Sequence, residues 1–349
     1  MTKAIKLFAW LALAFLCSVP GVASGAEQTL WGRYKADIID KDGRVLDYYQ
    51  DKNSHSEGQG YGMLLAVAYD DQATFDTLWK WTWQNLQKRS DKLLAWQWGK
   101  RDNGRWDVID YNNASDGDIL TAYALLRASE KWGRAEFKAD GLQLVKAIRE
   151  NLAMNWDGRT VILPSYYGFT KDDGIVVNPS YIILPAYRRF AKEDDRKFWE
   201  KAYEDGLHII ALSSFGYKSL PADWVKLMDN GKIRIHGERS VYAAHESVRV
   251  ILHLLQEDRS ILPKGVAETL KFYEGAGYIP LKADLEEDTY SMHSASAGVY
   301  AIYGAAAEKL GKKALAEKLF KEAREKLGYE KNNYYSFSLY LLATTQALR

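Results

Sequence analysis

Hydrophobic residues recur at the spacing of amphipathic helices along most of the chain. Apolar side chains at positions i, i+3 and i+4 mark the segments that we expect to be helical. These segments are residues 62–69, 73–86, 119–132, 142–152, 181–191, 198–212, 241–255, 266–273, 295–310, 314–327 and 335–348. Strand-like alternation is rare, and we expect hairpin arms only at residues 160–163 and 232–235. The pattern therefore predicts tandem helices joined by turns such as 172–174 and 229–231.

Helices in this number, connected by short loops, can close into a barrel whose loops gather at one end. They can also stack into an open array, and the periodicity alone does not decide between these two arrangements. No low-complexity linker divides residues 26–349, so we expect them to form a single domain.

The first 25 residues have the pattern of an export signal. Lys3 and Lys6 precede a short apolar run over residues 7–17, and small residues follow at 23–26. The run is short for a membrane span, although a retained anchor is the alternative interpretation. We therefore expect an exported protein, periplasmic or extracellular. The mature chain has no cysteine and must be stable without disulfides.

Charge and composition exclude several classes of function. The 47 basic residues nearly balance the 46 acidic ones, which argues against a nucleic-acid partner. The six histidines include no HExxH motif or other metal-ligand spacing, so we expect neither a metal nor another cofactor. P-loop and GxSxG motifs are also missing from the sequence. The 12 Trp and 23 Tyr residues could stack on sugar rings, although many of them must simply form the core.

The first candidate motif is Ser-His-Ser-Glu-Gly-Gln-Gly-Tyr-Gly-Met at residues 54–63. A capping box in which Ser54 and Glu57 satisfy each other is the purely structural interpretation. Three glycines in the first turns of a helix would each cost roughly 1 kcal/mol relative to alanine. That cost suggests that a neighbouring helix or a flat sugar ring approaches the backbone here. Among apolar neighbours, Glu57 would have a raised pKa, as a general acid requires.

The second candidate motif places two acids around a glycine. Ser115 can cap a helix whose first turn contains Asp116 and Asp118, and the helix dipole accounts readily for only one of these acids. Just upstream, Trp96 and Trp98 lie in a polar, glycine-containing loop, which favours stacking on sugars over a role in the core.

The third candidate motif is His245-Glu246-Ser-Val-Arg249, at the start of an amphipathic segment. An i, i+3 ion pair on the helix surface is its structural interpretation. Its functional interpretation is a carboxylate in a cleft beside a substrate ligand. Carboxylates, aromatics and a helical scaffold together suit the hydrolysis of glycosidic bonds.

At these motifs the sequence resembles glycoside hydrolase family 8, especially the periplasmic endoglucanases associated with bacterial cellulose synthesis. The likeness is clearest from about Gly43 to Arg249. The residues that carry it are Ser56-Glu-Gly-Gln-Gly-Tyr-Gly-Met63, Trp96-Gln-Trp-Gly99, Ala114-Ser-Asp-Gly-Asp118 with Ala122 and Trp132, and Asn178-Pro-Ser-Tyr181. Thr121 departs from the Ile or Met usual at its place. The resemblance implies an all-α (α/α)6 barrel, with a few short β-hairpins at the loop end, that inverts anomeric configuration.

The resemblance also implies roles for individual residues. Glu57 matches the proton donor to the leaving oxygen, and Asp116 matches the acid that holds the distorted sugar. Tyr181 and Arg249 match sugar-contacting positions, and Trp96 or Trp98 matches a stacking platform. We also expect Asp118 and His245 to bind the substrate.

The general base is the position at which the sequence departs from the family pattern. The cellulase pattern is Tyr-Asp-Ala-x-Arg, so Glu246 stands where Asp is expected and His245 where Tyr is expected. We expect Glu246 to be the base. In a chitosanase-like branch the base comes from a nearby loop, and Glu238 would then be the candidate.

The export signal and the resemblance together imply a secreted, inverting endo-hydrolase of β-1,4-linked glucan such as cellulose, which we expect to be monomeric. An exopolysaccharide or cellulose synthase complex is a candidate partner. A chitosanase, a xylanase or another exopolysaccharide hydrolase on the same fold is the first alternative. A polysaccharide lyase or a non-catalytic glycan-binding protein is the alternative from another class.

Overall fold

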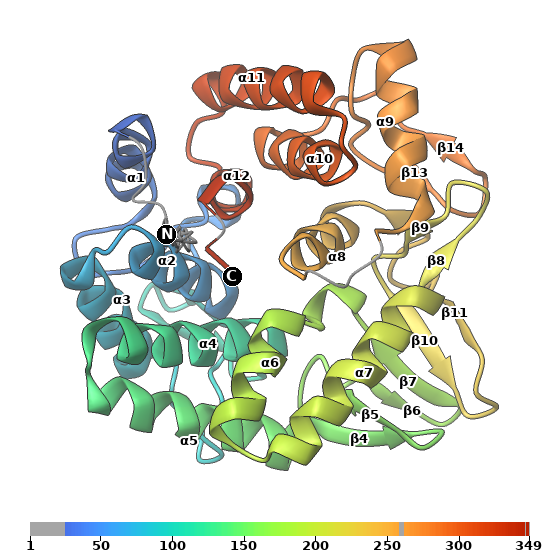
Figure 1. The fold of residues 1–349 in the computed structure, drawn as a ribbon. Coiled ribbons are helices and arrows are strands. Elements are labelled where there is room, and N and C mark those ends of the chain that lie inside the picture. The colour runs from blue at the N-terminus through green and yellow to red at the C-terminus, as the bar shows by residue number, and fades with distance from the viewer. Residues whose placement is uncertain (1–24, 258–261, 346, 349) are drawn as a thin grey trace, which may run out of the picture.

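Six inner helices form a closed ring. The computed structural model describes residues 25–257, 262–345 and 347–348. The inner helices are α2 (Ser56–Ala68), α4 (Ser115–Trp132), α6 (Leu184–Glu193), α8 (His245–Leu255), α10 (Ala297–Lys309) and α12 (Tyr334–Thr345). Each contacts the next in this order, and α12 returns to contact α2 (Figure 1). This contact excludes the open helical stack.

Six outer helices cover this ring. They are α1 (Gly25–Ile38), α3 (Gln72–Asn85), α5 (Ala135–Leu152), α7 (Arg196–Leu212), α9 (Lys264–Ala276) and α11 (Lys313–Tyr329). The outer helices pack on inner ones, as α5 does on α4 and α11 on α10. The alternation of inner and outer helices is that of an (α/α)6 barrel, as the resemblance to glycoside hydrolase family 8 implies.

Short antiparallel strands lie in the connections that lead from an outer helix to the following inner helix. They are β1 (Ser54–His55), β2 (Gln97–Lys100), β3 (Trp106–Asp110), β4 (Ala153–Trp156), β5 (Arg159–Ile162), β6 (Thr170–Lys171), β7 (Gly174–Val177), β8 (Ser214–Phe215), β9 (Leu220–Pro221), β10 (Val225–Met228), β11 (Ile233–Ile235), β12 (Tyr242–Ala243), β13 (Ala283–Asp284) and β14 (Thr289–Tyr290). Their sheet orders are β1-β2-β3, β11-β10-β7-β6, β12-β13-β14, β4-β5 and β8-β9. These hairpins therefore gather at the end of the barrel where the inner helices begin.

Several sequence-based element boundaries need correction. The helix expected from residue 241 begins only at His245, because Tyr242–Ala243 pairs with Ala283–Asp284 as a strand. The helix expected from residue 181 begins at Leu184, after a 3-10 turn over Pro179–Tyr181. The turns at 172–174 and 229–231 connect β6 to β7 and β10 to β11, so they join strands and not helices.

The outer helix α1 was not among the predicted helices. It carries a buried stripe formed by Trp31, Tyr34 and Ile38, and the ring of Trp31 stacks on Tyr69 at 5.3 Å between centroids. The export signal expected before it lies outside the described residues. Among those described, no helix is both long and apolar enough to cross a membrane.

Glycines allow α2 and α4 to approach each other closely. A Cβ on Gly60 would lie 2.6 Å from the Leu120 Cβ, and one on Gly117 would lie 2.1 Å from the Ser56 Oγ. Real side chains do not tolerate such distances, so alanine at either place would push the helices apart. The glycines of the 54–63 motif therefore serve, at least at Gly60, the close approach of a neighbouring helix.

Candidate active site

Three acidic residues occupy equivalent positions on three inner helices. Glu57, Asp116 and Glu246 are each the second residue of α2, α4 and α8, respectively. Because these helices begin at the same end of the barrel, residues distant in sequence are brought together. The free backbone N–H groups of a helix N-terminus also favour negative charge there.

One guanidinium joins the three carboxylates. Arg249 Nη1 donates to Glu57 Oε1 at 2.9 Å and to Asp116 Oδ2 at 2.8 Å. Its Nη2 donates to Glu246 Oε2. The Arg249 side chain is only 2% exposed, whereas those of Glu57 and Glu246 are 17% and 28% exposed. The two outer carboxylates are thus accessible from solvent, while the cation between them is buried.

The surroundings separate the protonation states of Glu57 and Glu246. Burial raises the pKa of Glu57 to about 7; Arg249 opposes this shift, and the charges of Asp116 and Glu246 add to it. Burial also acts to raise the pKa of Glu246, but the charge and hydrogen bond of Arg249 outweigh it and leave that pKa below its usual value. Near neutral pH, Glu57 can therefore hold a proton while Glu246 is ionised, as an acid and a base must be.

Asp116 has no comparable access to solvent. Its side chain is 3% exposed, and Oδ1 accepts the backbone N–H of Gly117 at 2.8 Å. Burial raises its pKa, against the effect of Arg249. Asp116 is thus the buried carboxyl of the three and shares Arg249 Nη1 with Glu57.

Comparison with known proteins agrees with this geometry. The sequence profile described as "Glycosyl hydrolases family 8" matches residues 3–347. The chain belongs to glycoside hydrolase family 8. The match extends well beyond Arg249, where the resemblance seen in the sequence weakens.

Individual relatives of this family 8 hydrolase carry endoglucanase names. An endoglucanase of Cellulomonas uda is 35% identical over 250 residues, which are 72% of this chain and 69% of that protein. A probable endoglucanase of Novacetimonas hansenii is 31% identical over 275 residues, 78% of this chain and 80% of that protein. The structure of the endo-β-1,4-glucanase CMCax from Acetobacter xylinum aligns with a TM-score of 0.80 at 29% identity, covering 92% of this chain and 97% of that one.

Hydrogen bonds from η2 (Pro179–Tyr181) and its cap hold Glu246 in this family 8 hydrolase. Asn178 Nδ2 donates to Glu246 Oε2 at 2.8 Å, and Ser180 Oγ donates to the same oxygen at 3.1 Å. The Tyr181 ring lies under Arg249, whose Cζ is 5.4 Å from the ring centroid. The Asn-Pro-Ser-Tyr motif thus contacts both the carboxylate and its counter-ion.

The structure places Asp118 away from this cluster. The residue has no exposed surface, and its oxygens accept the backbone N–H of Leu94 and the side-chain amide of Asn113, both at 2.8 Å. Burial raises its pKa to about 7, against these hydrogen bonds. Asp118 therefore fixes the loop that leads to Trp96, and this geometry does not present it to a sugar.

The two tryptophans of the predicted platform are packed against other residues of the protein. The Trp96 ring stacks on His55 with centroids 5.5 Å apart. The Trp98 ring stacks on Trp106 at 5.2 Å, and the Arg44 guanidinium lies 4.7 Å from both rings. Trp106, 41% exposed, presents more ring surface to solvent than either predicted residue, which are both half-buried.

Glu238 does not join the carboxylate cluster. Its side chain is 88% exposed, and its carboxylate lies 4.0 Å from His236 Nε2 in a loose pair. His245 is exposed at the start of α8, where its backbone oxygen accepts the Tyr335 hydroxyl at 2.5 Å. The arrangement favours Glu246 over Glu238 as the base.

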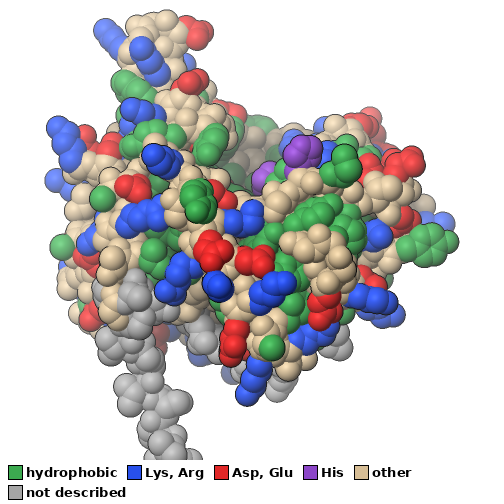
Figure 2. All heavy atoms as spheres, turned by 90° about the horizontal axis from the view of Figure 1, so that it is seen from above, with side chains coloured by type: hydrophobic (Ala, Val, Ile, Leu, Met, Phe, Trp, Pro, Cys, Tyr) green, Lys and Arg blue, Asp and Glu red, His purple; other side chains and the backbone are tan. Residues whose placement is uncertain are grey.

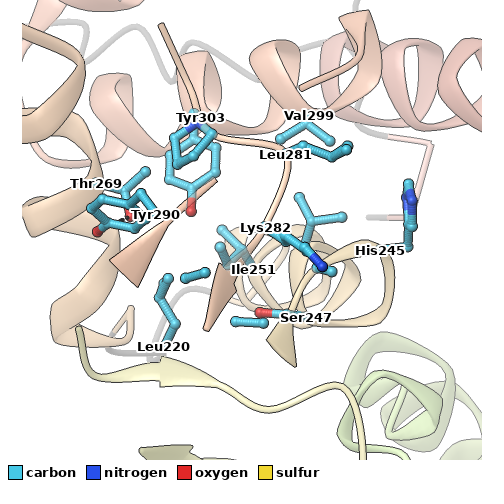
Figure 3. A pocket seen from close by; sticks show the side chains of 15 residues that line it. Leu220, His245, Ser247, Ile251, Thr269, Leu281, Lys282, Tyr290, Val299 and Tyr303 are labelled. Atoms are coloured by element: carbon cyan, nitrogen blue, oxygen red, sulfur yellow. Dashed lines mark hydrogen bonds between the residues drawn. The ribbon is translucent and has the colours of Figure 1, made fainter. Parts of the chain in front are cut away.

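A small pocket lies beside the acidic cluster, between α8, α10 and β13 (Figure 3). Its volume is about 30 Å³, enough for a few water molecules and too small for a sugar ring. His245, Ser247 and Lys282 contribute to its wall, whereas Glu57, Asp116 and Glu246 do not. Figure 2 shows a face that is hollowed near its upper edge, with histidine side chains beside the hollow and charges of both signs interspersed.

Two capping interactions considered for the sequence motifs do not form. Ser54 lies in β1 and donates to the Val45 carbonyl, and the N-cap position of α2 is occupied by His55, whose side chain makes no capping hydrogen bond. The Ser115 hydroxyl is buried without a partner, and Ala114 precedes its helix. Glu57 is therefore free of the capping box and faces Arg249.

Several residues of the site were not singled out from the sequence. Tyr61 Oη accepts from Arg249 Nη1 at 3.3 Å, and Tyr334 Oη lies 3.4 Å from Glu57 Oε2.

Asp223 Oδ1 accepts the backbone N–H groups of Ala244 and Ser247 at 2.8 and 2.9 Å, so it holds the start of α8. Burial raises the pKa of Asp223 to about 6. The adjacent tyrosines at the start of α12 were a sequence signal that could have indicated Tyr334 as a site residue. Asp223 lies in no recognisable motif, so the sequence offered no such signal for it.

Proposed function

We propose that this family 8 hydrolase cleaves β-1,4-linked glucan within the chain, with inversion of configuration. The observation that carries the proposal is that one guanidinium donates to Glu57 and Glu246 from different nitrogens, in surroundings that raise the pKa of Glu57 and lower that of Glu246. An inverting enzyme needs an acid and a base kept apart, with room for a water between the base and the sugar.

The mechanism follows from the positions of the oxygens. Glu57 Oε1 accepts from Arg249, so the transferable proton is best placed on Oε2, from which it passes to the glycosidic oxygen. Glu246 removes a proton from the water that attacks the opposite face of the sugar. Asp116 binds a ring hydroxyl of the distorted sugar, an interaction that strengthens in the transition state.

The substrate class rests on similarity and on exposed rings near the site. The relatives named above are endoglucanases, and CMCax is named an endo-β-1,4-glucanase. The hairpin that precedes Asp116 exposes Trp106 and, just beyond β3, Tyr111, which are 41% and 49% exposed. Such rings can stack on successive glucose units, whose faces are apolar.

The deciding experiment incubates the protein beginning at residue 26 with a soluble cellulose derivative, mixed-linkage glucan, xylan and chitosan. We expect reducing ends and a rapid fall in viscosity with the β-1,4-linked glucans, and α-anomeric products by NMR. Products that retain the β configuration would refute the mechanism, and preferential cleavage of xylan or chitosan would refute the substrate class. Unsaturated products would indicate a lyase, and binding without cleavage would indicate a non-catalytic protein.

We also propose that the protein is an exported monomer that trims polymer made by an exopolysaccharide or cellulose synthase complex. The predicted signal over residues 1–25 supports export. Cell fractionation and light scattering test location and oligomeric state, and co-purification from detergent extracts tests the synthase contact. Recovery from the cytoplasm would contradict export, and a stable dimer would contradict the monomeric state. Failure to co-purify would contradict the contact with a synthase complex.

A further inference from the structure

The Tyr334 hydroxyl lies between His55 and Glu57. It is 3.4 Å from His55 Nδ1 and 3.4 Å from Glu57 Oε2. Tyr334 and His55 are both buried, with 7% and 6% of their surface exposed. The three residues come from α12, β1 and α2, so the fold brings them together from both ends of the chain.

The surroundings of His55 place its proton on Nδ1. Burial lowers the pKa of His55, against the charge of Asp47, so the ring is neutral and carries one N–H. On the Nδ1 side lie the Tyr334 oxygen and, at 3.8 Å, Asp47 Oδ2. Nε2 is buried without a partner. Because a buried N–H without an acceptor is costly, the tautomer with hydrogen on Nδ1 is favoured.

This tautomer gives the hydrogen bonds a direction. If His55 Nδ1–H donates to the Tyr334 oxygen, the Tyr334 hydrogen is directed to the remaining acceptor, Glu57 Oε2. A hydroxyl that accepts a hydrogen bond becomes a stronger donor. The donation therefore gains strength as Glu57 loses its proton and negative charge develops on Oε2.

We propose that His55 is a positioning residue for the general acid, acting through Tyr334, whose hydroxyl hydrogen it directs to Glu57 Oε2. This inference rests on the proposed function, since it takes Glu57 to be the proton donor. Other groups facing Glu57 are Arg249, Asp116, Glu246 and Tyr61, and those facing His55 are Asp47, Tyr334 and the Trp96 ring. The substitutions of His55 described next leave these other groups in place.

Two substitutions of His55 separate its hydrogen bond from its ring. H55F keeps a flat ring against Trp96 and removes the Nδ1–H donor. H55N removes the ring and keeps an amide N–H near the place of Nδ1. If the donor matters, H55F lowers kcat several-fold with little change in KM. It also shifts the apparent pKa of the alkaline limb of the pH profile upward by about 0.5–1 unit. H55N then retains most of the activity and the original limb.

A double-substitution cycle tests whether the effect passes through Tyr334. In the Y334F background, H55F should change neither kcat nor the alkaline limb further, because the intermediate hydroxyl is gone. Additive effects of H55F and Y334F would overturn the proposal, as would an H55F enzyme with an unchanged limb. Thermal unfolding of every variant identifies losses caused by misfolding.

Nitrogen-15 NMR of the histidine ring tests the proton position without any substrate. We expect a protonated Nδ1 and an unprotonated Nε2 for His55, assigned by comparison with H55N. Hydrogen on Nε2 would overturn the proposal even in an active enzyme. Failure of the protein to cleave any glucan would instead refute the proposed function, because the NMR result does not depend on turnover.

Discussion

Glu57 and Asp116 hold equivalent places on neighbouring helices and accept hydrogen bonds from the same nitrogen, Arg249 Nη1, at 2.9 and 2.8 Å. Two carboxylates this close cannot both ionise freely unless a cation stands between them. The shared nitrogen therefore opposes the rise that burial causes in the pKa of both carboxyls. The following predictions depend on this arrangement.

Replacing Glu57 with glutamine should abolish turnover while glucan binding survives. The substitution keeps the shape and the hydrogen bond to Arg249 but removes the proton donor. General acid catalysis contributes about 10²–10⁴-fold, so kcat should fall by at least that range. Reducing-end assays and binding isotherms measure the two effects, and near-native rates would exclude Glu57 as the acid.

Replacing Glu246 with glutamine should have a similarly large effect, whereas E238Q should leave the rate within about twofold. Glu246 accepts from Arg249, Asn178 and Ser180, while Glu238 is exposed outside the cluster. The pair forms a matched test because the chemical change is identical. Loss of activity in E238Q with retention in E246Q would assign the base to the loop.

The protein should be more stable at pH 5 than at pH 8. The pKa of Glu57 is raised from 4.5 to about 7 by burial, and that of Asp118 from 3.8 to about 7. Between the unfolded and folded values the native state binds the extra protons, so stability is lost as pH rises through this window. The free energy of unfolding, measured by urea denaturation at each pH, should fall less steeply with rising pH in E57Q than in the wild type.

The same titration predicts the activity profile. The acid must be protonated, so kcat/KM should fall as pH rises through about 7, where Glu57 ionises. The acidic limb should lie below the usual glutamate value, because the pKa of Glu246 is lowered. A profile flat from pH 6 to 9 would contradict the assignment of the acid.

Replacing Gly117 with alanine should destabilise the protein and reduce activity together. The new Cβ would lie 2.1 Å from Ser56 Oγ and 2.7 Å from the Ser56 carbonyl carbon, next to Glu57 in α2. Such overpacking costs about 1–3 kcal/mol. G328A is the matched control, because nothing lies within 4 Å of its Cβ on α11. Equal melting temperatures for the two variants would show that the helix contact tolerates the methyl group.

The sequence predicted what depends on local pattern. Each of the eleven predicted helices overlaps an observed helix, although those expected from residues 181 and 241 begin later, and the predicted hairpin arms overlap β5 and β11. The outer helix α1 was not predicted, because its apolar stripe follows directly after the predicted signal. This stripe consists of Trp31, Tyr34 and Ile38. The hairpins at 97–110 and 170–177 were not predicted, because their short strands show little alternation of apolar and polar residues. These strands also pair with sequence-distant or polar segments.

The site was predictable as far as its motifs reach. Glu57, Asp116, Glu246 and Arg249 converge as expected from the resemblance. The burial of Asp118 could not be inferred, because its partner is the backbone N–H of Leu94, which only the folded loop brings into reach. The roles of Tyr334 and Asp223 depend likewise on contacts between distant segments.

Every strand of the described barrel lies in a connection that enters an inner helix, and none lies in a connection that leaves one. Lengthening, shortening or exchanging such a hairpin would therefore alter the surface that meets the polymer while leaving the helix-to-helix contacts intact. The same connections also position the chemistry, because Asn178 donates to Glu246 and His55 pairs with Gln97 of the 97–110 hairpin. Engineering toward other polysaccharides should therefore vary the exposed turn at residues 101–105 and keep the strand pairing beneath it.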